Sequence, residues 1–338
     1  MKFQTTGAVT VLYEYAKELQ EKQPKFALLI ADTAVAIASK LAAAGGLRSM
    51  LHLGRAYLEQ GRTLFVIGRY KDAEASLDQA ERAYDQDDNT TGWDLATVWL
   101  IRANIFVESE RFFEGRLLAT AAARQFRIFG DTALYLNAQL LLASVLFMEG
   151  DYRASAQASE EIVQQSRVRG DTVLLGRALQ NCGEAYLLLR EFDRAVPHYL
   201  EAYAIWDELG LETERIRTNW SLATVDTETG QLESGIRRLD ETYRAFETLG
   251  VVNDAALARM QLGEALLRAG RPETVPELLR NVVVSFASDG MMRNARIALA
   301  YLQDAIDQNW ASPELIRHVR AYIEQLPLRP TTRFVPLQ

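Results

Sequence analysis

Glycine recurs at intervals of forty residues, and this period constrains the fold more than any other feature of the sequence. Its members are Gly130, Gly170, Gly210, Gly250 and Gly290. Each follows a run with helical periodicity, where a helix needs a left-handed residue to end, and glycine adopts that conformation at the least cost. A chain with such a period is expected to stack similar units, each of which packs on its neighbours.

A second glycine series predicts a corner inside each unit, so that a unit is a pair of helices. Its members are Gly68, Gly150, Gly230 and Gly270, with Glu110 and Arg190 in register. The segments between the two series have the three-to-four-residue apolar periodicity of helices, and none alternates as a strand does. We therefore predict helix pairs at residues 8–22/25–44, 47–67/70–85, 92–109/111–129, 131–149/151–169, 171–189/191–209, 211–229/231–249, 251–269/271–288 and 291–308/313–325.

Capping residues support several of these helix starts. Asp131 and Asp171 directly follow period glycines, and each can accept a hydrogen bond from the first free N–H groups of the next helix. Asp254 is a candidate for the same role one turn after Gly250. The last helix has a cap and a proline at its first position, in Ser312-Pro313.

Composition limits the partner and the compartment. The 338 residues carry a net charge of −8, so nucleic acid, which needs clustered Lys and Arg, is not an expected partner. The single cysteine, Cys182, excludes an internal disulfide and fits a reducing compartment. We find no signal peptide and no uninterrupted apolar stretch long enough for a membrane span. A cytoplasmic location without membrane contact is expected.

Gly176 to Gly210 is the best-matched unit, and it resembles the tetratricopeptide repeat (TPR). The matching positions are Gly183, Tyr186, Phe192, Ala195, Tyr199 and Ala202. Leu179 stands where the family prefers Trp, and Cys182 where it prefers Leu. Small residues at Gly183 and Ala195 are expected to let the paired backbones approach closely, while Ala202 seats the next repeat. Partial matches recur in one register across residues 47–289.

The resemblance implies an all-α fold, a right-handed superhelical solenoid of about seven to eight antiparallel helix pairs. The forty-residue period is similar to that of the TPR modules of bacterial signal-responsive regulators, such as the maltose-regulon activator. We expect an atypical N-terminal capping pair at residues 1–46, six repeats at 47–289, a C-terminal capping pair at 290–326, and a flexible tail at 327–338. The tail sequence TTRFVPLQ also suits a docking peptide.

In the TPR family the first helices of successive repeats line a concave groove. Transferred by register, the candidate groove residues are Arg55, Arg62, Asn104, Asn137, Ser144, Arg177, Gln180, Glu184, Arg217, Trp220, Thr224 and Glu264. Asn137, Arg177 and Arg217 recur every forty residues, and such a ladder can hold a carboxylate or a peptide backbone, with Trp220 as an apolar anchor. The same residues also fit the solvated faces of amphipathic helices.

No constellation for catalysis, metal binding or cofactor binding is recognisable. His52, His198 and His318 are isolated from one another and from cysteine at metal-ligand spacing. Phosphate-binding and dinucleotide-binding glycine motifs and the G-x-S-x-G motif are absent. We therefore predict no catalytic residue, no metal and no cofactor, and interpret Cys182 as a buried apolar residue.

These observations favour a non-enzymatic scaffold that binds a protein or peptide partner in its groove, in bacterial signalling or regulation. Two alternatives stay open. In the first, the chain is the sensor portion of a transcription regulator or effector enzyme whose output domain lies on another chain. In the second, it is a sensor of a small ligand. The sequence identifies neither the partner nor the oligomeric state.

Overall fold

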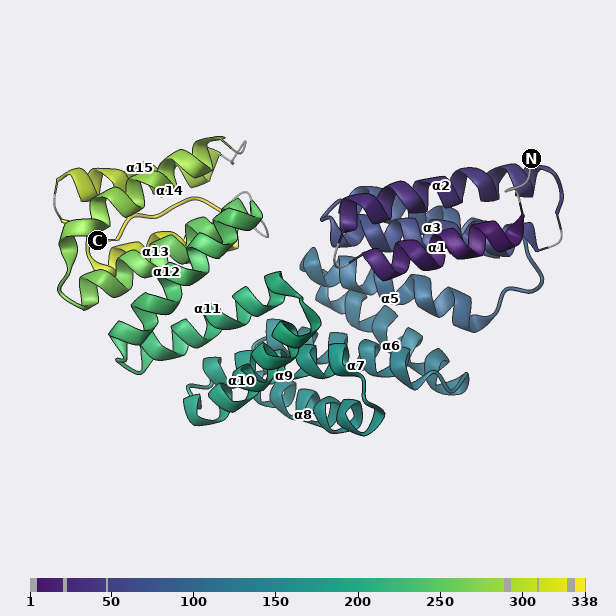
Figure 1. Ribbon diagram of the computed structural model, residues 1–338, viewed down its shortest axis with the longest axis horizontal. Coiled ribbons are helices and arrows are strands. Elements are labelled where there is room, and N and C mark those ends of the chain that lie inside the picture. Colours follow the sequence, from purple (N-terminus) through teal and green to yellow (C-terminus); the bar gives the residue numbers. More distant parts are fainter. Residues whose placement is uncertain are drawn as a thin grey trace. The chain divides into compact units, whose positions relative to one another are not determined.

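The computed structural model describes residues 5–20, 23–46, 48–288, 293–308, 310–326 and 332–337. These residues form sixteen α-helices and one 3₁₀ turn, and contain no strand (Figure 1). The all-α class is confirmed, and so are the predicted helix pairs. Most helix ends differ from the prediction by one or two residues. The chain divides into two units, Met1–Gln165 and Ser166–Gln338, which we describe one at a time.

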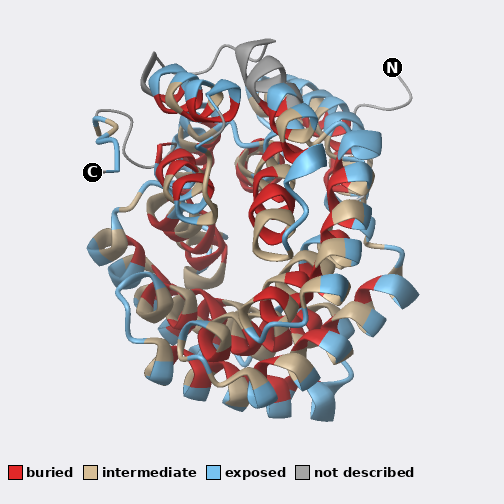
Figure 2. Cartoon of the chain, turned by 90° about the vertical axis from the view of Figure 1, so that its left-hand side faces the viewer, coloured by how far each residue is buried: buried red, intermediate tan, exposed pale blue. Residues whose placement is uncertain are grey.

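The first unit contains seven complete helices and most of an eighth. They are α1 (Thr6–Leu19), α2 (Pro24–Ala43), α3 (Ser49–Val66), α4 (Tyr70–Tyr84), α5 (Gly92–Glu108), α6 (Phe112–Ile128), α7 (Thr132–Met148) and α8 (Tyr152–Arg169). Successive helices pack against each other from α1 to α7. Their facing sides are rich in alanine and aliphatic residues, for example Ala103, Ala119 and Ala122 between α5 and α6, all with no exposed surface. Helices such as α4 and α6 bury one side and expose the other, whereas α5 and α7 are buried or partly buried up to their last residue (Figure 2).

The second unit continues with the same kind of helix pair. Its helices are α9 (Thr172–Leu188), α10 (Phe192–Leu209), α11 (Glu212–Glu228), α12 (Leu232–Leu249), α13 (Val252–Arg268), α14 (Val275–Ser288, preceded by the 3₁₀ turn Pro272–Thr274), α15 (Arg293–Asp307) and α16 (Pro313–Gln325). Their core includes Tyr199, Trp206 and Leu239, which are fully buried.

Close approach of α9 and α10 depends on glycine, as the sequence predicts. A Cβ atom at Gly183 would lie 2.5 Å from the ring of Tyr199, and one at Gly176 would lie 2.6 Å from the ring of Trp206. Two large buried rings of α10 therefore fill the space that two glycines of α9 leave open. Ala195 has no exposed surface, so the small-residue positions of this unit are packing positions.

The helix ends follow the two predicted series. Gly210 has φ of +66°, and the N–H of Leu211 donates to the carbonyl of Trp206, which closes α10 with a Schellman-type turn. At the corner before α10, Arg190 takes φ of +59°, and the N–H of Glu191 donates to the carbonyl of Tyr186. The corner therefore keeps its left-handed residue although arginine replaces glycine there, and this conformation costs an L-residue backbone free energy.

The predicted caps are confirmed at three of four helices. The carboxylates of Asp131 and Asp171 accept from the backbone N–H groups of Leu134 and Leu174, at 3.0 and 3.1 Å. The hydroxyl of Ser312 accepts from the N–H of the residue three further on, at 3.2 Å. Asp254 does not cap α13, which begins two residues earlier at Val252. Its carboxylate pairs with an arginine of α11 instead.

The last helices depart from simple succession. α16 packs against α13, although two helices separate them in the chain, and α14 packs against both α13 and α15. Met260, Leu279, Leu302 and Ile316, one from each of the four helices, belong to one buried cluster. The expected division into two capping pairs, six repeats and a tail stays a prediction.

Part of the expected flexible tail has a defined position. Residues 332–337 are extended and contact α15 and α16 through the ring of Phe334. Residues 327–331 and 338 of that expected tail lie outside the described residues.

α2 alone among the described helices is long and apolar enough to cross a membrane, judged by length and composition. This is weak evidence, because the buried helix of an ordinary helical protein passes the same test. In this structure Ala27, Ala31 and Ala34 of α2 are fully buried, and the helix packs against α1 and α3.

Candidate functional site

In the second unit, seven of the predicted groove residues lie on the first helices of three successive pairs. We call this set the first-helix face: Arg177, Gln180 and Glu184 on α9, Arg217, Trp220 and Thr224 on α11, and Glu264 on α13. Three or four residues separate neighbours on each helix, so each helix presents one stripe. Arg177 and Arg217 are exposed, and the rest are at least partly buried.

Hydrogen bonds at equivalent positions join α9 to α11 and α11 to α13. The Ser221 hydroxyl donates to Oε1 of Glu184 at 2.7 Å, and Nε2 of Gln261 donates to the Thr224 hydroxyl at 3.0 Å. Glu184 and Thr224 are forty residues apart, as are Ser221 and Gln261. Each bond spans 37 residues, three fewer than the period. A side chain tilts toward the N-terminus of its helix, so it reaches one turn back on the next first helix.

Ion pairs between successive first helices also span three residues fewer than the period. Arg217 of α11 pairs with Asp254 of α13 at 3.2 Å, again across 37 residues. In the first unit, Arg55 of α3 pairs with the buried Asp94 of α5 at 2.9 Å, across 39 residues where the local period is 42. The predicted groove positions Arg55 and Arg217 therefore both tie one first helix to the next.

Trp220 is held in place by its neighbours. Its indole N–H donates to Oε1 of Gln261 at 2.7 Å, and its ring meets Phe246 edge to face, with centroids 5.8 Å apart. Gln180 accepts a hydrogen bond from the Thr218 hydroxyl at 2.9 Å. Both side chains thus have fixed positions, which favours preorganised binding over adaptive binding.

Glu184 is the titratable group of the face with a displaced pKa. Burial raises the pKa of its carboxyl, because the charged form loses water, and the hydrogen bond from Ser221 opposes the rise. A carboxyl with a raised pKa is sensitive to a nearby cation, which would favour its charged form.

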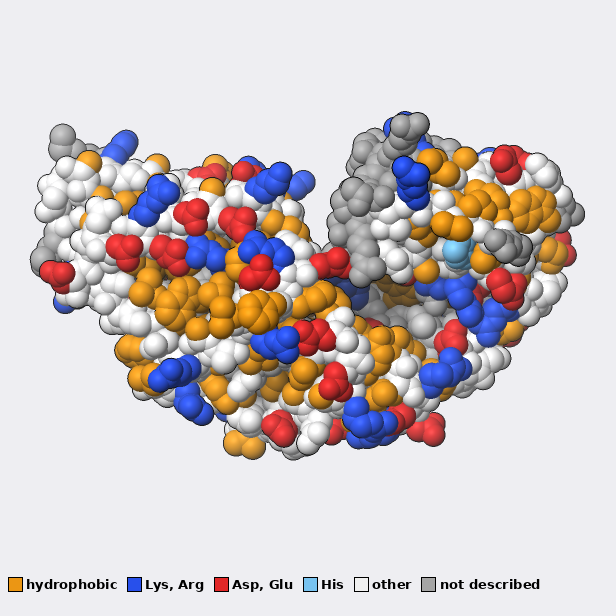
Figure 3. All heavy atoms as spheres, turned by 180° about the vertical axis from the view of Figure 1, so that it is seen from behind, with side chains coloured by type: hydrophobic (Ala, Val, Ile, Leu, Met, Phe, Trp, Pro, Cys, Tyr) orange, Lys and Arg blue, Asp and Glu red, His pale blue; other side chains and the backbone are white. Residues whose placement is uncertain are grey.

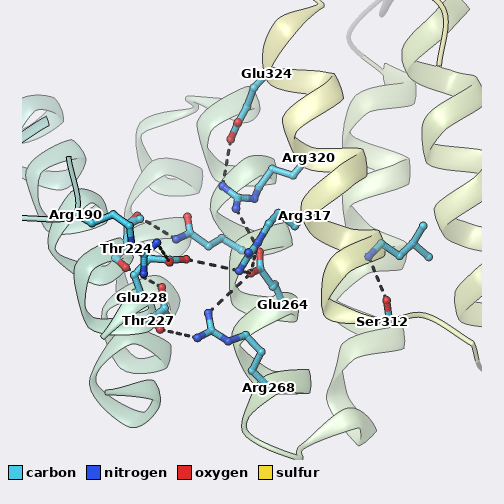
Figure 4. Close-up of polar contacts among 12 residues, drawn as sticks. Arg190, Thr224, Thr227, Glu228, Glu264, Arg268, Ser312, Arg317, Arg320 and Glu324 are labelled. Atoms are coloured by element: carbon cyan, nitrogen blue, oxygen red, sulfur yellow. Dashed lines mark hydrogen bonds and ion pairs between the residues drawn. The ribbon is translucent and has the colours of Figure 1, made fainter. Parts of the chain in front are cut away.

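Glu264 is the buried centre of an ionic cluster that connects α13 to α16 (Figure 4). Its side chain is 5% exposed, and its two oxygens lie 2.5 Å from Arg317 and 3.3 Å from Arg320, both of α16. Arg268 lies 4.0 Å away and donates to the carbonyl of Thr227 at 2.8 Å. The carboxylate is therefore used within the fold.

The cluster extends to α11 and to the corner before α10. Glu228 of α11 lies 3.6 Å from Arg317 and pairs with Arg190 at 3.2 Å (Figure 4). Glu324 of α16 pairs with Arg320 at 3.3 Å, and burial raises the pKa of its carboxyl. One end of the first-helix face is thus bordered by a set of paired charges.

The four other predicted groove residues lie in the first unit. Arg62 pairs with Glu59 one turn earlier at 3.2 Å. Asn104, Asn137 and Ser144 each donate to the carbonyl four residues earlier in their own helix. The proposed ladder of Asn137 with Arg177 and Arg217 joins residues of different units, and it stays a prediction.

Sequence reasoning missed the partners that fix this face. Ser221 and Gln261 were not among the predicted residues, nor were Arg317 and Arg320. A signal existed for the first two, because Asn181, Ser221 and Gln261 recur as polar residues every forty positions. No such signal existed for the arginines of α16, which packs outside the regular succession.

Charges of both signs are interspersed on the molecular face drawn in Figure 3. The described residues on that face form no extended basic patch of the kind that phosphate binding requires. Within the described part of the chain, no group of three His, Cys, Asp or Glu residues is placed to hold a metal ion. The thiol of Cys182 is fully buried, as expected.

Residues 134–208, which cover α7 to α10, match the family model of the tetratricopeptide repeat. Over this span the chain contains tetratricopeptide repeats. The matched span contains Gly183, Ala195 and Ala202, the residues on which the resemblance rests. Among curated proteins, no sequence matches the chain.

Solved TPR-type structures share the fold. A Rap protein in complex with competence and sporulation factor is 12% identical, with a TM-score of 0.69, over 96% of this chain and 88% of the Rap chain. NprR in complex with its cognate peptide NprX is 16% identical, with a TM-score of 0.57, over 96% of this chain and 83% of NprR. The predicted similarity of this chain to bacterial signal-responsive regulators is confirmed at the level of the fold.

A third structure bears on the expectation of a non-enzymatic protein. Aspartyl phosphate phosphatase F from Bacillus subtilis is 12% identical, with a TM-score of 0.62, over 91% of this chain and 79% of the phosphatase. The fold is therefore compatible with an enzyme as well as with a binding protein. The absence of enzymatic activity in this chain stays a prediction, as does its cytoplasmic location.

Proposed function

We propose that this TPR protein binds a peptide or a peptide segment of a partner protein on its first-helix face, as part of bacterial signalling. The observation that carries the proposal is the pair of exposed guanidiniums, Arg177 and Arg217, at equivalent positions of α9 and α11. They border a stripe of polar side chains whose positions are fixed by cross-helix hydrogen bonds. Two arginines at the edge of a fixed polar stripe suit a ligand that carries a carboxylate.

The ion pair of Arg217 with Asp254 does not prevent this role. Side chains of these two residues are 46% and 24% exposed, and such a pair contributes about 1 kcal/mol or less. A ligand carboxylate can therefore replace Asp254 at little cost. Glu184 and Trp220 would then supply contacts to a backbone amide and an apolar side chain, from positions that need no rearrangement.

The similar folds support this choice of ligand class. Two of the compared structures hold a peptide or a signalling factor, namely NprR with NprX and the Rap protein with competence and sporulation factor. At 12–16% identity they contribute the fold and the plausibility of a peptide ligand, and they do not identify the ligand of this chain.

The test is a capture experiment with paired variants. The wild-type chain and the double variant Arg177→Ala/Arg217→Ala are immobilised, and bound proteins and peptides from a bacterial lysate are compared by mass spectrometry. Ligands enriched by the wild-type chain should be lost by the double variant. Those ligands should then bind the purified chain more weakly as C-terminal amides if the carboxylate is terminal.

A matched control replaces two exposed arginines in ion pairs outside the face, Arg116→Ala/Arg271→Ala. Arg116 pairs with Glu149, and Arg271 with Glu233. Circular dichroism verifies the fold of both double variants. Equal capture by the wild type and the Arg177/Arg217 variant would exclude the proposed site.

A further inference from the structure

The chain carries its own extended segment on a second surface, which shares no residue with the first-helix face. Thr332 to Leu337 lies across α15 and α16. Its first four residues alternate as an extended peptide on a surface does, with Thr332 and Phe334 partly buried and Arg333 and Val335 exposed, and its last two residues are both exposed. Pro336 favours this conformation, because the residue before a proline is confined to extended backbone.

The ring of Phe334 packs against three aromatic side chains of α15 and α16, which we call its seat. Its centroid lies 5.0 Å from that of Tyr322, 5.3 Å from that of His318 and 5.5 Å from that of Tyr301. The Tyr322 contact is edge to face, the arrangement that aromatic pairs prefer. The ring also packs against the buried cluster of α13 to α16.

The same three side chains hold the backbone of the segment. Tyr322 donates its hydroxyl to the carbonyl of Thr332 at 2.8 Å, and Tyr301 donates to that of Leu337 at 3.3 Å. His318 Nε2 lies 2.7 Å from the carbonyl of Val335 and donates to it. One aromatic anchor and three side-chain hydrogen bonds to backbone carbonyls thus hold the segment, a combination that suits recognition of an extended peptide.

We propose that Thr332 to Leu337 is a peptide ligand bound in cis, and that its seat on α15 and α16 is a second peptide-binding site of the chain. The occupant is an extended segment with a phenylalanine anchor, supplied by the chain itself. When this segment leaves, the seat takes another segment of the same chemistry. Helices α15 and α16 position the three seat residues independently of the segment, because their inner sides pack on α13 and α14.

The experiment supplies the segment in trans. A fluorescein-labelled synthetic peptide with the sequence of residues 332–337 is titrated with the full chain and with a chain that ends at residue 331, and anisotropy reports binding. The shortened chain should bind the peptide. The full chain should bind it at least about tenfold more weakly, because its own segment competes for the same site. A peptide with Phe334→Ala should lose about tenfold or more in affinity, whereas Arg333→Ala should leave affinity unchanged.

Two further variants keep the test decisive if shortening impairs folding. The full chain with Phe334→Ala keeps its length but loses the anchor, so it should bind the wild-type peptide as the shortened chain does. Adding His318→Ala to that chain should abolish the gain. If the folded Phe334→Ala chain and the shortened chain both fail to bind the peptide, the segment is only a structural part of the fold. These measurements use no ligand of the first-helix face, so their failure leaves the proposed function unaffected.

Discussion

The contacts from α9 to α11 and those from α13 to α16 both join helices that are not consecutive, but they use different chemistry. Between α9 and α11 each link is a single hydrogen bond such as Ser221 to Glu184, repeated in register between α11 and α13. Between α13 and α16 a buried carboxylate, Glu264, meets two arginines. The repeated links follow from the period, whereas the ionic cluster is made once, where the regular succession ends.

The difference predicts where the second unit is most vulnerable. Glu264→Ala should lower the free energy of unfolding of α13 to α16 by about 3 kcal/mol, because it removes the buried partner of Arg317 and Arg320 and leaves the largely buried Arg320 with Glu324 alone. Urea unfolding measures the loss, and hydrogen exchange of α16 amides locates it, since repeat arrays need not unfold in one step.

Glu233→Ala is the matched control, because Glu233 pairs with Arg271 at an exposed site. We expect it to cost about 1 kcal/mol or less. If exchange protection of α16 were the same in Glu264→Ala and in the wild-type chain, the cluster would not be what holds α16 to α13.

The second prediction addresses the repeat itself. Gly183→Ala places a Cβ atom 2.5 Å from the fully buried ring of Tyr199, so α9 and α10 must separate or the ring must move. We expect a loss of about 1–3 kcal/mol in urea unfolding. Gly7→Ala in α1 is the control, because its Cβ atom would meet only a hydroxyl at 3.8 Å. This substitution should raise the free energy of unfolding by about 0.5 kcal/mol, because alanine favours the helix more than glycine does. Equal effects of the two substitutions would show that the close approach is unimportant.

The contrast also explains what the sequence could and could not predict. Small residues such as Gly183 and the capping carboxylates Asp131 and Asp171 act within one pair or at its edge, so local patterns predicted them. Links such as Glu184 with Ser221 required knowledge of which turn faces which, although the period contained that information. The pairing of Arg317 with Glu264, 53 residues apart, follows no period and needed the structure.

A smaller effect tests the corner series. Arg190 adopts φ of +59° where the equivalent position forty residues earlier is Gly150. Arg190→Gly should therefore stabilise the chain by about 0.5–1 kcal/mol, the left-handed penalty less the exposed pair with Glu228. The converse substitution, Gly150→Ala, should destabilise by about 1 kcal/mol. Thermal unfolding compares the two, and a loss of stability in Arg190→Gly would mean that the pair with Glu228 outweighs the backbone strain.

The smallest expected effect is the pH dependence of stability that comes from Glu184, the carboxyl that takes part in the hydrogen bond between α9 and α11. Burial raises the pKa of Glu184 above its ordinary 4.5, so the folded chain holds a proton that the unfolded chain has released. Stability should then fall as pH rises from about 4.5 to the raised pKa, since the native state binds more protons in that window. Glu184→Gln removes this fall while it keeps an acceptor for Ser221.

The melting temperatures of the wild type and of Glu184→Gln should therefore agree most closely near pH 4.5 and diverge as pH rises, with the variant higher. Ser221→Ala removes one of the two hydrogen bonds that oppose the pKa rise, so it should extend the fall in stability to higher pH. Parallel curves for all three chains would mean that Glu184 stays charged in the fold. The link to α11 would then be an ionised one, closer in kind to the cluster around Glu264.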